Sequence, residues 1–307
     1  MFFLRFWGTR GSISCPGEKT VKFGGNTASL ELRAGKDIYG IDLGTGVRAF
    51  GEHLLKNDLR EGLETINFFL THTHLDHIIG FPMFTPVYIP KIKLNFYAPC
   101  MINQASLKEL LKTQLSYEFW PINLSEMAAD LNFYHLRETT LNFANGLTVK
   151  TKYLNHPVTD LGYRFEYKGK SIALVYDTEP FFNQFGSHKH GQGRMNFFDK
   201  DASREAEITA GEENGKIIKF MEDADLVLYD AQYNEEQYLT EKLNWGHSTY
   251  ECAITNSIIA RVKTLVLYHH DPARNDAALT KVEEDFKKQY SSKINIIMAR
   301  EGMKLEP

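Results

Sequence analysis

The sequence has few cysteines and no long apolar run, and both shortages narrow what the protein can be. Its three cysteines, Cys15, Cys100 and Cys252, lie far apart and form no CxxC pair. This spacing argues against a disulfide framework and a thiolate zinc site, and it predicts a reducing, cytoplasmic environment. The apolar stretch Met1–Gly8 is interrupted by Arg5 and is too short for a signal sequence or a membrane span, so we expect a buried first strand and no membrane partner.

The sequence also lacks an excess of positive charge. Its 35 Lys and Arg residues stand against 39 Asp and Glu residues, which gives a formal net charge of -4. Such a chain has no general electrostatic attraction for long nucleic acid or anionic membranes, which disfavours both as partners and leaves only a local basic patch open. With 43% hydrophobic residues, the composition is that of a globular protein with a sizeable core.

No Pro/Gly/Ser-rich linker and no repeat divides the chain, so we predict a single domain over residues 1–307. Short runs of β-branched and aromatic residues alternate with helix-like segments, which is typical of an α/β architecture. The predicted strands are Ser29–Leu32, Ile38–Ile41, Ile66–Leu70, Lys93–Tyr97, Leu147–Tyr153, Ser171–Tyr176, Leu226–Tyr229, Thr264–Tyr268 and Lys293–Met298. The clearest helices are Asn103–Leu115, Thr249–Ala260 and Asp276–Tyr290.

The stretch 179–213 is the least regular part of the sequence, with four glycines and a charged run. Long glycine-bearing segments are commonly exposed surface excursions, and that is our first interpretation of this insertion. A lid or substrate-recognition insert is the second. Four aromatic residues are candidates to line a pocket for a base or to form a homodimer interface: Phe181, Phe182, Phe197 and Phe198.

Three imidazoles and a carboxylate lie within six residues, in the segment His72-Thr73-His74-Leu75-Asp76-His77. Imidazole nitrogen and carboxylate oxygen are ligands of zinc, manganese and iron in hydrolytic sites. In an extended segment His72 and His74 point to one side and can hold one ion together, while Asp76 and His77 follow on the turn and can face a second ion. The alternative is a surface turn with solvated histidines, which the clustering after a buried strand disfavours.

Other predicted strands also end in candidate ligands. His156 follows the strand at 147–153, Asp177 follows 171–176, and His269 and His270 follow 264–268. Open α/β sheets place their sites at the carboxyl ends of strands. Taken singly, His156 could be an ordinary loop histidine and Asp177 a cap of the next segment.

Taken jointly, these residues complete two coordination sites. The first would contain His72, His74 and His156, and the second Asp76, His77 and His269, with Asp177 as the bridge. Two ions about 3.5–4 Å apart can share a hydroxide, which is the nucleophile of a two-metal hydrolase. His269 and His270 compete for one position; we choose His269 because it directly follows the strand, and we expect His270 to orient a ligand or a substrate oxygen.

This pattern resembles the metallo-β-lactamase superfamily, whose mark is an HxHxDH motif followed by an isolated His, an Asp and a final His. The segment Ile41–Gly46 resembles the strand and glycine turn that precede the motif, and Tyr176–Thr178 resembles the segment with the bridging aspartate. The resemblance implies an αββα sandwich with a dinuclear metal site along one edge.

Within that superfamily the sequence is similar in pattern to the phosphodiesterase branch, which includes tRNase Z and cyclic-nucleotide phosphodiesterases. Phe6–Ser12 and Phe23–Ala28 resemble the opening of that branch, where a glycine-rich turn and an asparagine, here Asn26, approach the metals. The resemblance also implies an acidic residue and a catalytic histidine, here Asp230 and His247. In tRNase Z the acidic residue is usually Glu, which is one methylene longer than Asp230.

Such a dyad has a physical rationale. A histidine oriented by a carboxylate can donate a proton to a departing alkoxide, so His247 is the candidate general acid and Asp230 its partner. The alternative for His247 is a neighbour of a helix N-cap at Ser248 or Thr249. Asp76 is assigned a catalytic role beside its role as a ligand. Two divalent ions are expected, zinc first, with manganese and iron as alternatives.

The leading functional hypothesis is a metal-dependent phosphodiesterase that cleaves a small phosphodiester such as a cyclic nucleotide through a metal-bridging hydroxide. RNA processing of the tRNase Z type is the first alternative; the acidic charge and the lack of a Gly/Pro-rich arm, such as tRNase Z uses to grip tRNA, disfavour it. Lactone or thioester hydrolysis is the second, because the same ions can polarise a carbonyl. Iron-dependent oxidoreductase chemistry is the third.

Overall fold

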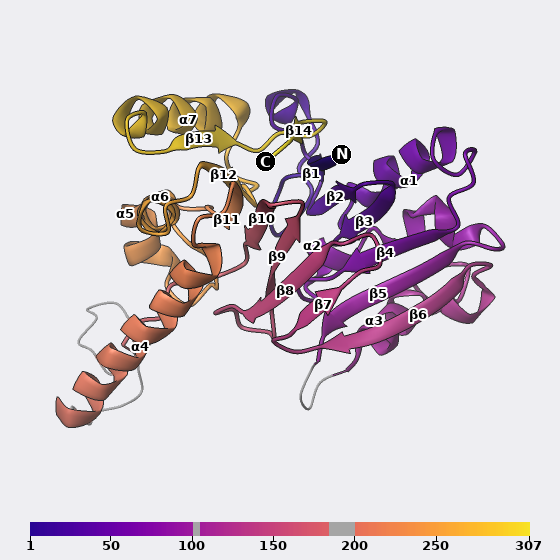
Figure 1. Ribbon diagram of the computed structural model, residues 1–307, viewed down its shortest axis with the longest axis horizontal. Helices are drawn as coiled ribbons and strands as arrows, with labels where there is room; N and C mark the ends of the chain where they lie inside the picture. Colours follow the sequence, from indigo (N-terminus) through magenta and orange to yellow (C-terminus); the bar gives the residue numbers. More distant parts are fainter. Residues whose placement is uncertain (101–104, 184–199) are drawn as a thin grey trace.

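Two large β-sheets form the centre of the molecule (Figure 1). The computed structural model describes residues 1–100, 105–183 and 200–307. The first sheet has the strand order β14-β1-β2-β3-β4-β5-β6, and the second has the order β13-β12-β11-β10-β9-β8-β7. Both are seven-stranded and mixed, with the parallel run β3–β6 in the first and β10–β13 in the second.

The strands follow the apolar runs of the sequence. The first sheet consists of β1 (Phe2–Gly8), β2 (Ser29–Ala34), β3 (Asp37–Ile41), β4 (Thr65–Phe69), β5 (Lys93–Pro99), β6 (Asp130–Leu136) and β14 (Lys304–Leu305). The second consists of β7 (Thr140–Asn142), β8 (Thr148–Tyr153), β9 (Leu161–Tyr167), β10 (Lys170–Val175), β11 (Leu226–Asp230), β12 (Thr264–Tyr268) and β13 (Asn295–Met298). All the predicted strands are confirmed, with boundaries shifted by at most two residues.

Helices cover the outer faces of the two sheets (Figure 1). They are α1 (Val47–Lys56), α2 (Leu75–Ile78), α3 (Leu107–Gln114), α4 (Lys200–Met221), α5 (Glu235–Gln237), α6 (Tyr250–Ile259) and α7 (Asp276–Tyr290). Short turns of helix lie at η1 (Glu18–Thr20), η2 (Phe81–Met83), η3 (Thr85–Tyr88), η4 (Leu124–Glu126) and η5 (Tyr238–Lys242). Capping side chains start the longer ones: Ser106 caps α3, Thr249 caps α6 and Asn275 caps α7.

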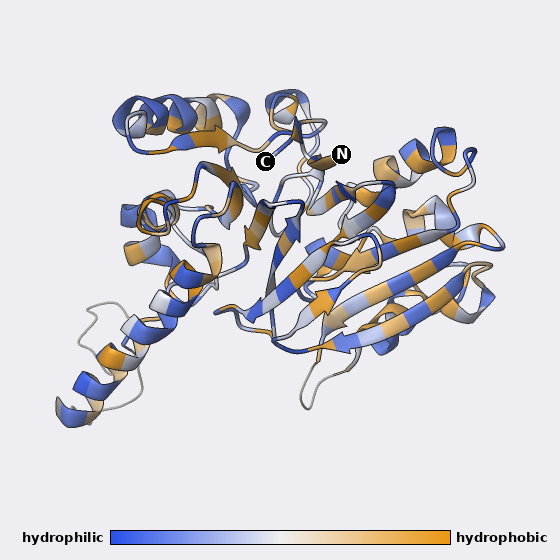
Figure 2. Ribbon diagram, viewed as in Figure 1, coloured by the Kyte–Doolittle hydropathy of each residue, from blue (hydrophilic) through white to orange (hydrophobic). Residues whose placement is uncertain are grey.

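Three apolar clusters hold these layers together. One joins the facing sides of the two sheets and includes Phe69 and Phe165; a second lies under α1 and α3, and a third under α4, α6 and α7. The alternation of apolar and polar residues along the strands is visible in Figure 2. The layers are therefore helix, sheet, sheet and helix, which confirms the predicted αββα sandwich.

The prediction that residues 179–213 form an irregular segment is wrong from Lys200 onward. From Lys200 to Glu213 the chain belongs to α4, whose later turns are anchored by buried Ile217 and Met221. The outer half of α4 points away from the body and is mostly hydrophilic (Figures 1 and 2). Ala, Glu and Lys, which favour helices, outweigh the two glycines of α4. Whether this segment is a lid or a surface insertion stays a prediction.

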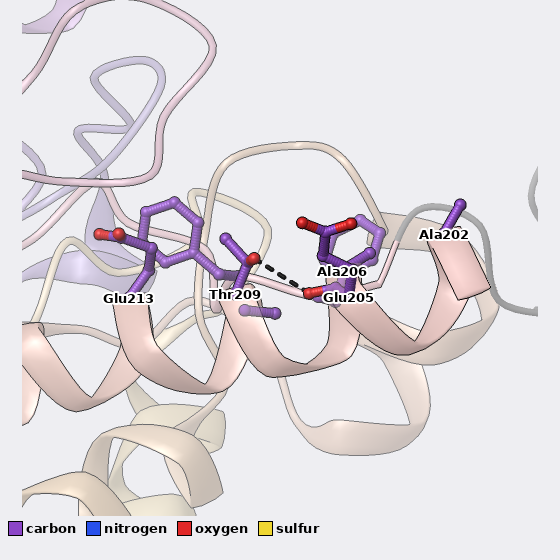
Figure 3. Close-up of a pocket in the computed structure, with 8 residues that line it drawn as sticks. Ala202, Glu205, Ala206, Thr209 and Glu213 are labelled. Atoms are coloured by element: carbon purple, nitrogen blue, oxygen red, sulfur yellow. Dashed lines mark hydrogen bonds between the residues drawn. The ribbon is translucent and has the colours of Figure 1, made fainter.

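Two of the four aromatic residues singled out in this stretch, Phe181 and Phe182, line a cavity of about 420 Å³. The other residues that line it all belong to α4, on which Thr209 Oγ1 donates to the Glu205 carbonyl at 3.0 Å (Figure 3). None of the candidate metal ligands lines this cavity. Phe197 and Phe198 lie outside the described residues, as do His188 and His190.

The structure bears on two further expectations. Cys15, Cys100 and Cys252 are free thiols. Within residues 1–100, 105–183 and 200–307, every helix is too short or too polar to cross a membrane.

Candidate metal centre

The predicted ligands come together at one edge of the two sheets. His72 follows the end of β4, His156 follows β8, Asp177 follows β10 and His269 follows β12. Strands β8, β10 and β12 of the second sheet run in the same direction, because β8 and β10 are both antiparallel to β9 and the pairs β10–β11 and β11–β12 are parallel. Their carboxyl ends therefore deliver the side chains to one place.

The first group of candidate ligands consists of three imidazoles. The side chains of His72, His74 and His156 have nitrogen atoms within 4.8 Å of one another. His156 Nε2 lies 3.0 Å from His74 Nδ1, and His156 Nδ1 lies 2.9 Å from the Gly246 carbonyl. Because that carbonyl can only accept, Nδ1 of His156 carries the hydrogen and Nε2 presents its lone pair to the group. His74 is exposed and His156 half-buried, so this group is open to solvent.

The second group is fully buried and contains carboxylates. It consists of Asp76, His77, Asp177 and His269. His77 Nε2 and His269 Nε2 are 3.2 Å apart, and each lies 3.2 Å from Asp76 Oδ2. One ligand atom from each of the four residues lies within 4.8 Å of the others, so the four together could hold one cation.

Asp177 is placed between the two groups. Its Oδ2 is 3.7 Å from His72 Nε2 in the first group and 3.4 Å from His77 Nε2 in the second, and its Oδ1 is 3.2 Å from His269 Nε2. A carboxylate in this position can contact a cation on either side. The grouping predicted from the sequence therefore agrees with the arrangement in space, and the role of Asp177 as the bridge stays a proposal.

The pKa shifts of the side chains in the two groups also favour the binding of cations. Burial lowers the pKa of His72 well below its ordinary value and that of His156 to about 4, so both are neutral ligands at pH 7. Despite the burial, His77 and His269 hold the pKa of Asp76 below its usual range. Burial opposes a charge on His77, but the carboxylates of Asp76 and Asp177 raise its pKa well above the ordinary value. A proton occupies the place that a cation would take.

Two buried polar atoms without a hydrogen-bond partner also indicate that these residues could hold a cation. His72 Nε2 and Asp177 Oδ1 are buried polar atoms with no hydrogen-bond partner, although such atoms are nearly always satisfied in folded proteins. Both point into the cluster of imidazoles and carboxylates. A divalent ion would satisfy both, and nitrogen and oxygen donors of this kind suit zinc, manganese or iron.

A second layer of side chains fixes the ligands in position. Asp42 Oδ2 accepts from His77 Nδ1 at 2.9 Å and from the Tyr176 hydroxyl at 2.7 Å, while Asp42 Oδ1 accepts from the Thr71 amide at 2.8 Å. The hydrogen bond at Nδ1 leaves Nε2 of His77 as the nitrogen that faces the site. Asp42 lies in the segment whose resemblance was noted, but its role was missed.

The N-terminal loop closes the buried group from the other side. The backbone amide of Ser12 donates to Asp76 Oδ2 at 2.7 Å. The side-chain amide of Gln232 lies 2.9 Å from His269 Nδ1 and orients that ring. Gly11 passes so close that a Cβ there would lie 2.4 Å from Gln232 and 2.6 Å from the His269 ring. Only glycine fits at position 11, which explains the glycine-rich opening of the chain.

Strained backbone marks the strand ends that carry these residues. Asp42, Asp177 and His269 have φ angles of 57°, 55° and 61°. Side chains other than glycine rarely adopt this left-handed conformation, and such strain is concentrated at functional sites. The turn redirects each side chain from the sheet face into the cluster.

The predicted dyad lies beside the two groups. Asp230 Oδ2 is 3.0 Å from His247 Nδ1 and also accepts from the amides of Thr178 and Ser248, each at 3.2 Å. Burial opposes a charge on His247, but Asp230 raises the pKa of His247 to about 9. Because Oδ2 of Asp230 already accepts from two amides, we assign the shared proton to His247. The N-cap of the alternative interpretation is present, because the Thr249 side chain caps α6 two residues after His247, but the His247 ring itself contacts Asp230.

The structure separates the adjacent histidines at the end of β12. His269 lies in the buried group, whereas His270 Nε2 bonds the Ala299 carbonyl at 2.9 Å and its ring packs edge-on against Phe23. The Asn26 side chain also contacts the scaffold, because its Nδ2 donates to Glu301 Oε2 at 3.0 Å. The contacts of His270 and Asn26 are thus with the scaffold, and the roles expected for them toward a substrate or the metals stay predictions.

The fold has solved counterparts. The chain matches the metallo-β-lactamase fold protein YhfI from Bacillus subtilis with a TM-score of 0.62 at 15% identity, covering 100% of this chain and 99% of that one. It matches human tRNase Z, short form, with a TM-score of 0.60 at 19% identity, covering 99% and 98%. The chain has the metallo-β-lactamase fold.

Sequence comparison also finds curated relatives of this protein. Ribonuclease Z of Streptococcus pneumoniae (strain CGSP14) is 25% identical over 293 residues, covering 85% of this chain and 88% of the relative. Ribonuclease Z of Lactococcus lactis subsp. lactis (strain IL1403) is 25% identical over 242 residues, covering 71% and 75%. No protein-family profile matches the chain. These matches in fold and in sequence confirm the resemblance to the metallo-β-lactamase superfamily.

Proposed function

We propose that this protein is a metal-dependent hydrolase that cleaves phosphodiester bonds. The observation that carries the proposal is the pair His247–Asp230, whose Nδ1 and Oδ2 are 3.0 Å apart next to Asp177 and His156; Asp230 raises the pKa of His247 to about 9, which favours the imidazolium at pH 7. A carbonyl substrate such as a lactone needs polarisation and a nucleophile, whereas a phosphodiester with an alkoxide leaving group also needs a proton. A buried imidazolium at the cluster supplies that proton.

The chain's own residues would perform the remaining steps as follows. His72, His74 and His156 would hold one divalent ion, Asp76, His77 and His269 a second, and Asp177 would contact both. Bound ions would polarise the phosphoryl group and activate water. Asp76 would keep its orientation through the Ser12 amide, and His247 would pass its Nε2 proton to the leaving oxygen, since Nδ1 is bonded to Asp230.

Two substrate classes stay in competition, each favoured by a specific observation. The two Ribonuclease Z relatives, which match 85% and 71% of the chain, favour RNA and make it the first candidate. The net charge of -4 favours a small phosphodiester such as a cyclic nucleotide.

One set of assays on the metal-loaded protein tests this proposal. Bis(p-nitrophenyl) phosphate, cyclic AMP, a precursor tRNA with a 3′ extension, a lactone and a thioester are compared side by side, with Asp177→Ala as the inactive control. We expect turnover of phosphodiesters that the variant abolishes. Cleavage of the precursor tRNA alone among the natural substrates selects RNA. Cleavage of only the lactone or the thioester contradicts the proposal.

A further inference from the structure

An exposed tryptophan lies at the rim of the candidate site. Trp245 precedes Gly246 and His247, and 56% of its surface is accessible, which is unusual for the largest apolar side chain. The Gly246 carbonyl bonds His156 Nδ1 at 2.9 Å. Trp245 is thus one residue from a group that orients a candidate ligand and two residues from the candidate general acid.

The loop that carries Trp245 is held in place by a buried carboxylate. Glu179 accepts from the Tyr238 hydroxyl at 2.7 Å, from the Asn244 amide at 2.8 Å and from the Gly246 amide at 3.0 Å. Gly246 has a φ of 81°, and a Cβ there would lie 2.4 Å from His156 Nδ1. These bonds fix the backbone on both sides of Trp245, so the exposed ring is presented by a rigid loop.

A positive charge accompanies the ring. Lys242 Nζ lies 3.7 Å from the centroid of Trp245 and 5.7 Å from that of Tyr233. The Tyr233 ring in turn meets the His247 ring edge-on at 6.2 Å. Among the residues that the structure describes, no ion pair includes Lys242, and its ammonium lies against the Trp245 ring. An aromatic ring beside an ammonium suits a ligand that has a flat base and a phosphate.

We propose that Trp245 and Lys242 form a platform that binds the nucleobase of the substrate next to the reacting phosphate. This inference rests on the proposed phosphodiesterase function and deepens it, because it makes the substrate a nucleotide. Stacking on an aromatic ring tolerates any base, so the platform sets a preference for nucleotides over other phosphodiesters without selecting a sequence. It serves the terminal base of an RNA and the base of a cyclic nucleotide alike.

The test uses two esters with the same leaving group, thymidine 5′-(p-nitrophenyl phosphate) and methyl p-nitrophenyl phosphate, on the metal-loaded protein. Trp245→Ala is expected to lower the ratio of kcat/KM for the nucleoside ester over the methyl ester about ten-fold, mainly through KM. Trp245→Phe should restore most of that ratio. The control is Ile259→Ala, which removes an apolar side chain of the same 56% exposure at the far end of α6 and should leave the ratio unchanged.

An unchanged ratio in Trp245→Ala overturns the platform, and so does an equal loss on both esters, which would make Trp245 a structural residue. If the wild-type protein cleaves neither ester, the proposed function fails. The platform is then tested by a binding measurement that does not depend on catalysis. Thymidine monophosphate is expected to quench tryptophan fluorescence in the wild type and not in Trp245→Phe. Equal quenching in both proteins contradicts the platform.

Discussion

The two groups of candidate ligands differ in exposure and charge. His72, His74 and His156 are neutral imidazoles whose group opens to solvent at His74 and His156, whereas the group around His77 is buried and contains the carboxylates of Asp76 and Asp177. The buried group also has the second layer formed by Asp42 and Gln232. An anionic, supported site holds a cation more firmly than an open neutral one. We therefore expect the buried group to retain its metal more firmly and the open group to be the side from which the substrate enters.

Removing the residue common to both groups should have the largest effect. Asp177→Ala removes the carboxylate that faces His72, His77 and His269, so we expect a loss of turnover on the order of 10³-fold or more and a fall in bound metal. Metal analysis and phosphodiester turnover measure both. The matched control is Asp225→Asn. It alters a carboxylate that precedes β11, at the end of the strand away from Asp230 and the candidate site, and that pairs with Lys263. Full activity in Asp177→Ala would refute the shared role.

Removing the candidate general acid should separate chemistry from metal binding. His247→Ala is expected to keep both metals and to lose about 10²- to 10⁴-fold in turnover of cyclic AMP or RNA, whose leaving groups need a proton. Bis(p-nitrophenyl) phosphate should be affected far less, because nitrophenolate leaves without one. A variant that loses metal, or that slows both substrate types equally, would make His247 a ligand or a structural residue.

A change in the second layer should affect the buried group alone. Asp42→Asn keeps the shape of the side chain but removes the charge that holds His77 Nδ1, and such changes weaken metal affinity about 10- to 100-fold. Competition with a chelating dye measures the affinity of each ion. We expect the tighter of two binding steps to weaken; a change confined to the weaker step would reverse our assignment of the two groups.

The smallest expected effect is on the pH profile. Asp230 raises the pKa of His247 to about 9, above its ordinary value, so the acid is protonated at pH 7 and is lost as pH rises through the shifted pKa. Turnover of cyclic AMP or RNA should therefore decline on the alkaline side, and bound cations will move this limb to lower pH by repulsion. The limb should be absent with bis(p-nitrophenyl) phosphate. The same limb with both substrates would argue against proton donation.

The sequence was sufficient to predict which residues gather at the candidate metal centre, because they follow strands or lie consecutively. The cluster at 72–77, and His156, Asp177 and His269 at later strand ends, could be located without knowing how the strands pair. Strand β9 was missed although Leu161–Tyr167 alternates apolar and polar residues, a pattern that could have identified it. Helix α4 was missed because its glycines were given more weight than its Ala and Glu content.

The supporting residues could not be predicted for a different reason. Asp42, Gln232 and Glu179 are single polar residues whose roles depend on contacts with segments 35, 37 and 67 positions away. No local pattern encodes such contacts. The choice between His269 and His270 followed from strand direction, but the turn of the His270 ring toward Ala299 depends on packing against Phe23.

The most direct test of the account is the number of metal ions bound per chain together with turnover. We predict two ions in the wild-type protein, one in His74→Ala, and phosphodiester hydrolysis only in the protein with two. His74 is the exposed member of the open group, so its removal should not disturb the core. A wild-type protein that binds a single ion, or a His74→Ala variant that keeps two ions and full activity, would contradict the two-ion centre.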